Sequence, residues 1–178
     1  MTTIFCSQKL EKFLGKIDTM TKDEREAPLG NWNGHLFHVD RKRCLIFLNS
    51  KTCYCLLMTA VTKQKIGDIQ IFFRERLIRQ LNNDFTLTES REVNIRQHLG
   101  DTRICETNND RNVIGTMNQF VKTIPYYTKR FGAVENWEEL KMSHLLNETP
   151  VDAKVSANKK KSGYFFPNEA MAELVKAL

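Results

Sequence analysis

The chain has 178 residues, 41% of them hydrophobic, and its 27 basic and 21 acidic residues give a net charge of +6. This length fits one domain, and the hydrophobic share is too high for a wholly disordered chain. No apolar run reaches the roughly 20 residues that span a bilayer, and no leader peptide is apparent at the start. We therefore expect a single soluble domain, residues 1–178, in the cytoplasm, with no membrane partner.

The cysteines predict buried thiols, not a disulfide scaffold or a metal centre. Their number, five, is odd, and each lies in an apolar segment that is typical of a strand. His35 and His38 precede Cys44, Cys53 and Cys55, but the paired ligand spacings of a zinc site are absent. We expect no bound metal and no other cofactor.

The first third of the chain predicts mainly strands. Residues 2–6 alternate as a strand, and Ser7 can cap a short helix over residues 8–14 before a polar loop over residues 16–31. Three short apolar runs follow, separated by polar turns, over residues 36–39, 44–48 and 53–58. This spacing is typical of an antiparallel meander.

The rest of the chain predicts mainly helices, with one more strand at residues 102–106. Apolar residues recur at helical spacing over 68–81, over 89–99, in a long helix after Asn108–Asp110, from Asn136 to Leu146, and over 168–178. Pro125 should kink or divide the long helix, and residues 147–163 predict a flexible loop before the C-terminal helix. The predicted fold class is α+β, an antiparallel β-meander packed against several helices.

Basic residues cluster on four predicted elements and favour a nucleic-acid partner. The clusters are Arg41, Lys42 and Arg43; Arg74, Arg76 and Arg79; Lys129 and Arg130; and Lys159, Lys160 and Lys161. Aromatic residues flank the last two clusters, at 126–127 and 164–166, a pairing suited to stacking the bases of a single strand. The alternative is that the basic turns serve solubility and the aromatic residues belong to the core.

Arg91 and His98 form a candidate catalytic pair on the helix over residues 89–99. Their spacing resembles the R-x(4–6)-H motif of the HEPN ribonucleases, which implies proton transfer by the histidine in a composite dimer site. Glu92 departs from that motif, because a small polar residue is usual directly after the arginine. The alternative is an ordinary solvated helix face.

Two stretches together carry a second resemblance, residues 32–36 with 40–52 and residues 111–118. They resemble an uncharacterised bacterial family, a domain of unknown function met in mobile or plasmid-borne settings. The resemblance implies a shared fold unit over about residues 2–125 and that genomic setting, but no activity. Its polar and aromatic positions are Trp32, Asp40, Asn49, Lys51, Arg111 and Asn118.

These motif residues allow two interpretations. In the first they form a structural network, in which Asp40 pairs with Arg111 while Asn49 and Asn118 tie turns to the long helix. In the second they line a cleft for a ligand or a nucleic acid.

The sequence favours a non-enzymatic binding protein that acts on nucleic acid, RNA above all, or on a nucleoprotein. A concrete form is a mobile-element inhibitor of a bacterial nuclease defence, such as an anti-CRISPR protein. Two alternatives stay open. One is a small metal-independent ribonuclease or toxin that uses Arg91 and His98, and the other is a small-ligand-binding module centred on Trp32, Arg41 and Arg111.

Overall fold

The structure, a computed structural model, describes residues 1–15, 17–18, 27–100, 102–152 and 163–178. The strands are β1 (Thr2–Cys6), β2 (Trp32–Val39), β3 (Lys42–Asn49), β4 (Cys55–Met58), β5 (Thr102–Glu106), β6 (Val151–Asp152) and β7 (Tyr164–Phe165). The helices are α1 (Gln8–Leu14), α2 (Lys63–Ile66), α3 (Ile69–Phe85), α4 (Glu89–Leu99), α5 (Arg111–Phe131), α6 (Glu139–Asn147) and α7 (Pro167–Lys176), with a 3-10 turn, η1 (Val134–Asn136). The α+β class is confirmed.

The central sheet is mixed, with strand order β4-β3-β2-β1-β5. Strands β2, β3 and β4 pair antiparallel as a meander, whereas β1 pairs parallel with both β2 and β5. The prediction of an antiparallel meander therefore holds for three of the five strands and is wrong for the sheet as a whole. The parallel pairing joins Ile4 to Ile104, a separation along the chain for which no local turn signal exists.

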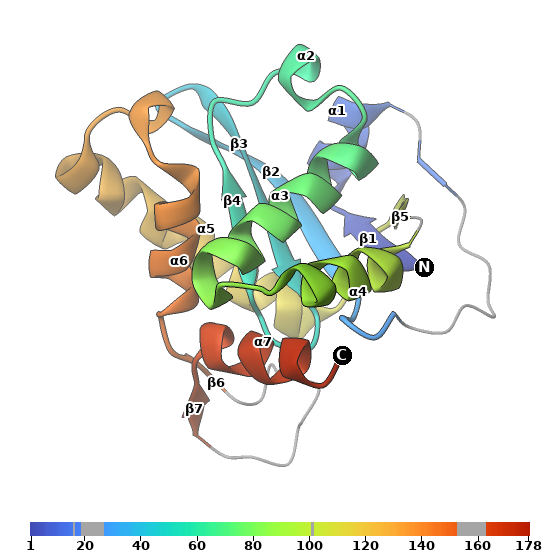
Figure 1. The fold of residues 1–178 in the computed structure, drawn as a ribbon. Coiled ribbons are helices and arrows are strands. Elements are labelled where there is room, and N and C mark those ends of the chain that lie inside the picture. The colour runs from blue at the N-terminus through green and yellow to red at the C-terminus, as the bar shows by residue number, and fades with distance from the viewer. Residues whose placement is uncertain (16, 19–26, 101, 153–162) are drawn as a thin grey trace.

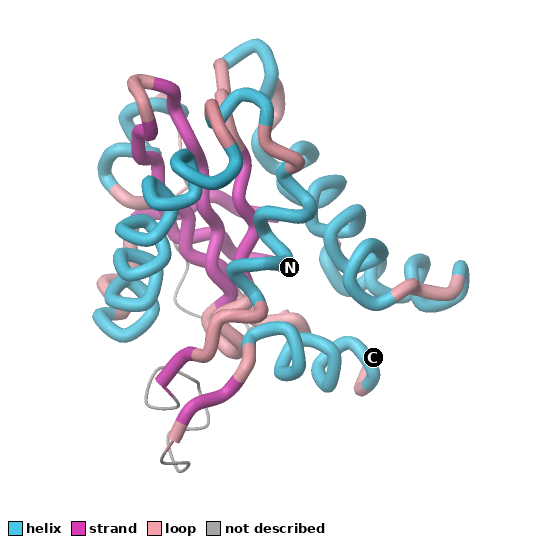
Figure 2. Tube along the Cα trace, turned by 90° about the vertical axis from the view of Figure 1, so that its left-hand side faces the viewer, coloured by secondary structure: helices cyan, strands magenta, loops and turns pink. Residues whose placement is uncertain are grey.

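Helices cover both faces of this sheet (Figure 1), and the view in Figure 2 shows the strands between them. Helices α1, α3, α4 and α7, here called the first layer, pack against one core that includes Leu10, Phe73, Ile95 and Met171. Helix α5 packs on the opposite face, against a second core. Within the described residues, no helix is long and apolar enough to cross a bilayer.

Helix α6 covers the open edge of β4. Glu139, Ser143 and Asn147, four residues apart on one helix face, bond to the backbone of Thr59, Leu57 and β4 residue Cys55 in turn. The Asn147 side chain completes a two-way pairing, because its Oδ1 accepts from Cys55 N at 2.7 Å and its Nδ2 donates to Cys55 O at 3.1 Å. The helix thus satisfies strand groups that would otherwise be free to pair with another chain.

Two predicted boundaries are wrong. Pro125 lies inside α5 and does not divide it, because the buried Phe120 and the partly buried Phe131, on either side of it, hold both halves against one core. Asn136 ends the turn η1, and α6 starts only at Glu139.

Part of the predicted loop over residues 147–163 forms regular secondary structure. Asn147 belongs to α6, and β6 pairs antiparallel with β7. The cluster Lys159, Lys160 and Lys161 lies outside the described residues.

Candidate functional site

Helix α5 presents one apolar and one polar face. Asp110 caps its first turn, since Asp110 Oδ1 accepts from Asn112 N at 3.0 Å and from Val113 N at 3.3 Å. The buried residues Val113, Met117, Phe120 and Ile124 recur at helical spacing against the sheet. The opposite side of the helix is therefore exposed along its whole length.

This exposed side, here called the α5 face, consists of Arg111, Asn112, Asn118, Gln119, Lys122, Tyr126, Lys129 and Arg130. It carries basic residues, amides and one tyrosine but no acidic residue, because the 21 residues of α5 contain no aspartate or glutamate. None of its four basic side chains forms an ion pair with a described residue. At a rise of 1.5 Å per residue the face is about 28 Å long. Its charge is thus open to an outside partner.

The two tyrosines of α5 differ in environment. Tyr126 is 67% exposed, and Lys129 Nζ lies 5.9 Å from its ring centroid. Tyr127 packs edge-on against Phe131 and Trp137, and burial raises its pKa. Only Tyr126 therefore offers an aromatic surface beside the basic residues of this helix.

The hairpin between β2 and β3 lies at the C-terminal end of the α5 face. Val39 pairs with Lys42 across a two-residue turn, in which Asp40 and Arg41 have φ angles of 47° and 65°, as a type I′ turn requires. Lys42 Nζ lies 3.6 Å from Glu135 Oε1 of η1, just after α5. Arg41 and Lys42 are therefore brought to the same end of the molecule as Lys129 and Arg130.

Arg43 does not point to the same side of the hairpin as Lys42. Its guanidinium lies 5.6 Å from the ring centroid of Phe13, which packs with the first layer. Side chains alternate across a strand, so neighbouring residues such as Lys42 and Arg43 point to opposite faces.

The three arginines of α3 do not share the solvent-facing side that the sequence predicted for them. Arg74 Nη1 donates to Gly100 O at 2.7 Å, at the end of α4. Arg76 is only 7% exposed, its Nη2 donates to Leu57 O at 3.2 Å, and burial lowers its pKa. Arg79 alone is exposed. The prediction was wrong because residues two apart lie about 200° apart around a helix.

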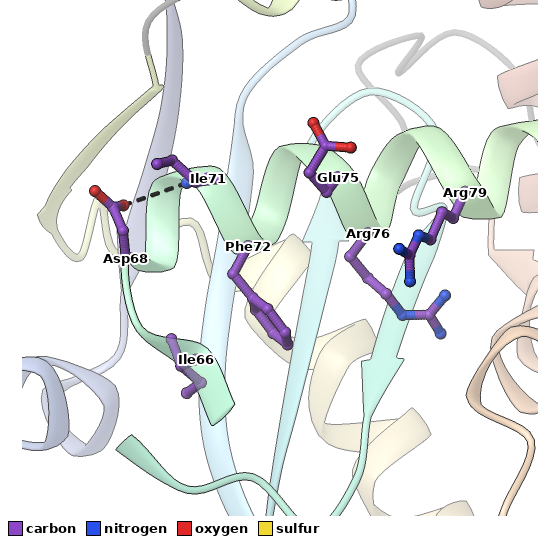
Figure 3. Close-up of a pocket in the computed structure, with 7 residues that line it drawn as sticks. All are labelled: Ile66, Asp68, Ile71, Phe72, Glu75, Arg76 and Arg79. Atoms are coloured by element: carbon purple, nitrogen blue, oxygen red, sulfur yellow. Dashed lines mark hydrogen bonds between the residues drawn. The ribbon is translucent and has the colours of Figure 1, made fainter. Parts of the chain in front are cut away.

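Arg76 and Arg79 border a hollow of about 360 Å³ between α2 and α3 (Figure 3). Ile66 and Phe72 provide its apolar wall, and the two guanidinium groups lie at one end. Arg76 Nε is 3.6 Å from Glu139 Oε2 of α6. The buried arginine therefore serves mainly to join α3 to α6 and β4.

Two motif residues form a structural network, but with a different partner from the predicted one. Asn49 Oδ1 accepts from the backbone N of Lys51 and of Thr52, each at 3.0 Å, and Asn49 Nδ2 donates to Leu29 O at 2.7 Å. Lys51 Nζ donates to Pro28 O at 3.2 Å. These residues tie the turn after β3 to the segment before β2, not to α5.

The remaining motif residues are spread over the molecule. Trp32 is fully buried and packs edge-on against Phe73, with ring centroids 5.2 Å apart. Asp40 lies in the hairpin near the C-terminal end of α5, whereas Arg111 begins that helix, so the predicted Asp40–Arg111 pair is wrong. For the same reason Trp32, Arg41 and Arg111 do not converge on one ligand site.

Residues 3–170 match the family described as a domain of unknown function, DUF6933. The chain belongs to this family. The match confirms the resemblance to an uncharacterised family and extends it beyond residue 125 to the helices after α5. No curated protein matches the chain.

In this DUF6933 protein the candidate catalytic pair lies on α4. Arg91 and His98 are two helical turns apart, about 10 Å along the axis, and Arg91 is exposed whereas His98 is partly buried. The hollow in Figure 3 is lined by other residues. Catalysis by the pair stays a prediction.

Sequence reasoning missed a buried polar cluster around Asp84. The Asp84 side chain is fully buried; the Tyr54 hydroxyl donates to its Oδ2, and Gln80 Nε2 to its Oδ1 at 3.1 Å. His144 Nδ1 lies 3.0 Å from Asp84 Oδ1, and His144 Nε2 lies 3.3 Å from Glu148 Oε1. Burial and the nearby Asp84 carboxylate raise the pKa of Tyr54. This cluster ties α3, α6 and the start of β4 together.

All five cysteines of the DUF6933 chain are buried and free of disulfides. Burial raises the pKa of Cys6 and of Cys53 to about 12 and that of Cys44 to about 11. Such thiols are weak nucleophiles at neutral pH. In the part of the chain that the structure describes, no three His, Cys, Asp or Glu side chains gather as metal ligands.

Proposed function

We propose that this protein binds single-stranded nucleic acid, RNA above all, along the α5 face. The observation that carries the proposal is the charge pattern of α5, which exposes four unpaired basic residues and no acidic one. Unpaired lysines and arginines in a row bind a phosphate backbone by releasing its condensed counterions.

The other side chains of the face suit the same ligand. Asn112, Asn118 and Gln119 are exposed amides, which bond to phosphates, sugars and base edges. Tyr126 offers a ring on which an unpaired base can stack, and such stacking tolerates any sequence. Because bases are free to stack on side chains only when they are unpaired, this ring favours a single strand over a duplex.

The hairpin extends the surface. Arg41 and Lys42 lie beyond the C-terminal end of α5, where Lys42 reaches Glu135. A strand that follows the α5 face would therefore meet two more cations as it leaves Lys129 and Arg130. Arg43 and Arg74 have partners elsewhere, and the proposal does not use them.

A concrete setting for this binding is the cytoplasm of a bacterium, where the protein acts on the nucleic acid of a nuclease defence as an inhibitor encoded by a mobile element. The basic α5 face and the small size of the chain support it. In a pull-down from host lysate, nuclease treatment should then release the captured partner.

The proposal is tested by two charge-reversal variants of equal net charge. The first changes Lys122, Lys129 and Arg130 to glutamate on the α5 face. The second changes Lys12, Arg79 and Arg91 to glutamate in the first layer, where all three are exposed. Binding of a labelled single-stranded RNA 12-mer is measured by fluorescence anisotropy at low salt.

The α5 variant should lose affinity on the order of a hundredfold, while the first-layer variant should stay close to wild type. Equal losses in both variants would show that only the net charge matters. Unchanged binding by the α5 variant would refute the proposed surface.

A further inference from the structure

A small hollow lies beside the first half of the α5 face, where the chain connections of two parallel strands diverge. Strands β1 and β5 are parallel neighbours. β1 leads into α1 of the first layer, whereas β5 leads into α5 on the opposite face. In α/β sheets, the crevice at the carboxyl ends of two such strands is where ligands bind.

The hollow encloses about 160 Å³. Its lining residues are Phe5, Ser7, Asn33, Gly34, His35, Thr107, Ile114, Met117 and Asn118. Phe5, Ile114 and Met117 make apolar walls, and none of the described residues that line the hollow is a lysine, arginine, aspartate or glutamate. Since a water occupies about 30 Å³ of liquid, the space admits one small ring but not a sugar and phosphate as well.

One side chain in the hollow lacks a partner. Asn33 is only 2% exposed, yet its Nδ2 makes no hydrogen bond to any residue that the structure describes. A buried amide donor without an acceptor destabilises the folded state, and a ligand oxygen placed against it would remove this penalty. The hollow is therefore short of one hydrogen-bond acceptor.

His35 adds to the polar side of the hollow. Burial, together with the nearby charge of Lys9, lowers the pKa of His35, so its ring is neutral at pH 7 and offers one donor and one acceptor. With neutral polar groups and apolar residues both in its lining, the hollow fits an uncharged planar ring that has both carbonyl and N–H groups.

The position of the hollow connects it to the proposed binding surface. Asn118 lines the hollow and also belongs to the α5 face. We propose, building on the proposed function, that one unpaired pyrimidine base of the bound strand, uracil in RNA, inserts here, with a carbonyl oxygen accepting from Asn33 Nδ2. The α5 face then binds the backbone without regard to sequence, and the hollow selects one base.

The test compares all-uracil and all-adenine RNA 12-mers of equal length and charge. Wild type should bind the uracil strand about tenfold more tightly. Asn118→Trp should fill the hollow from an exposed position and abolish this preference. Val93→Trp, at an exposed position of α4 in the first layer, should keep it. Asn33→Leu should also abolish it, provided that circular dichroism shows the variant folded.

Three outcomes separate this proposal from the proposed function. If both strands bind with steep salt dependence but equal affinity, the hollow does not select a base and only this inference fails. If Asn118→Trp keeps the preference, selection arises elsewhere and the inference again fails. If neither strand binds at low salt, the proposed function fails. Titration with free uridine then tests the hollow by itself: a shift of the Asn33 side-chain amide NMR signal supports a base site there, and the absence of a shift overturns it.

Discussion

The first layer and α5 lie on opposite faces of one sheet, and their basic side chains differ in how many of them have partners within the protein. In the first layer, Arg96 binds Glu75 at 2.8 Å and Glu92 at 2.9 Å, Arg74 binds Gly100 O, and Arg76 reaches Glu139. On α5 no basic side chain has such a partner among the described residues. Lys12, Arg79 and Arg91 of the first layer are also exposed without an ion pair to a described residue, but they lie on three different helices. What marks the α5 face is therefore a row of unpaired cations along one helix, not the number of arginines and lysines.

The difference in pairing also affects the free energy of folding. Exposed ion pairs such as Arg96–Glu75 contribute about 0–1 kcal/mol, so the first layer gains little from each. Unpaired cations along one helix face repel one another and add nothing to folding. We infer that the two cores hold the fold, whereas the α5 face is available for binding.

The largest effect is expected in the two cores, one on each face of the sheet. Burial raises the pKa of Cys6, Cys44, Cys53 and Cys55 above the usual value of 9.0. The unfolded chain releases these protons near that value, while the folded chain keeps them to higher pH, so stability is full below pH 9.0 and falls above it. Between about pH 7.5 and about pH 10 the unfolding free energy should drop by about 1.4 kcal/mol for each of the four thiols, or about 5 to 6 kcal/mol in all.

Urea denaturation across this pH range measures the effect. Cys55→Val should weaken the dependence on pH, whereas charge reversal of Lys122, Lys129 and Arg130 should leave it unchanged. A flat profile in the wild-type protein would contradict the assigned burial of the thiols.

The next largest effect separates stability from binding. Asp84→Ala removes the carboxylate that contacts Tyr54, Gln80 and His144, so the fully buried Tyr54 hydroxyl loses its acceptor. The unfolding free energy should fall by about 3 kcal/mol, with RNA affinity unchanged. Glu173→Ala, which removes only an exposed pair with Lys176, should cost less than about 0.5 kcal/mol. Equal losses in the two variants would mean that the Asp84 cluster does not stabilise the fold.

A smaller effect distinguishes the two tyrosines of α5. Tyr126→Ala should lower RNA affinity about tenfold with no loss of stability, because the exposed ring stacks only on a ligand. Tyr127→Ala should do the reverse and lower the melting temperature, since Tyr127 packs on Trp137. Thermal denaturation measures the stability of both variants, and fluorescence anisotropy measures their RNA affinity. A destabilised Tyr126→Ala variant would contradict a role of Tyr126 in binding alone.

The smallest effect concerns the hairpin. Arg41 has a φ of 65°, a region that is strained for any residue with a Cβ but open to glycine. Arg41→Gly should therefore raise the unfolding free energy by about 0.5 kcal/mol and yet weaken RNA binding. Arg43→Gly, in the extended strand β3, should destabilise the protein instead. A loss of stability in Arg41→Gly would show that the turn does not store this strain.

Local structure was predictable from the sequence because local signals determine it. The capping residues Ser7, Asp68 and Asp110 each start a helix as expected, since their side chains accept backbone N–H groups of the first turn. The parallel pairing of β1 with β5 was not predictable, because contacts between residues about 100 positions apart leave no periodic pattern. The same holds for the buried cluster that joins Tyr54, Asp84 and His144.

The candidate site was predictable only in part. Lys129, Arg130, Arg111 and Asn118 were singled out, but as members of separate clusters, and Lys122 was missed. The absence of acidic residues from 111 to 131 was visible in the sequence and marks the face once the helix is known to be continuous through Pro125. The hollow under α5 was not visible, since β1, β2, the end of β5 and α5 each contribute to it.

The central claim, that the α5 face binds the phosphate backbone, is tested most directly by the salt dependence of RNA binding. A plot of the logarithm of the binding constant against the logarithm of salt concentration has a slope of about −0.7 per phosphate contact for a single strand. Reversing Lys122, Lys129 and Arg130 should make this slope shallower by about 2, whereas reversing Lys12, Arg79 and Arg91 should leave it unchanged. An identical slope for wild type and both variants, or binding that does not depend on salt, would contradict the claim.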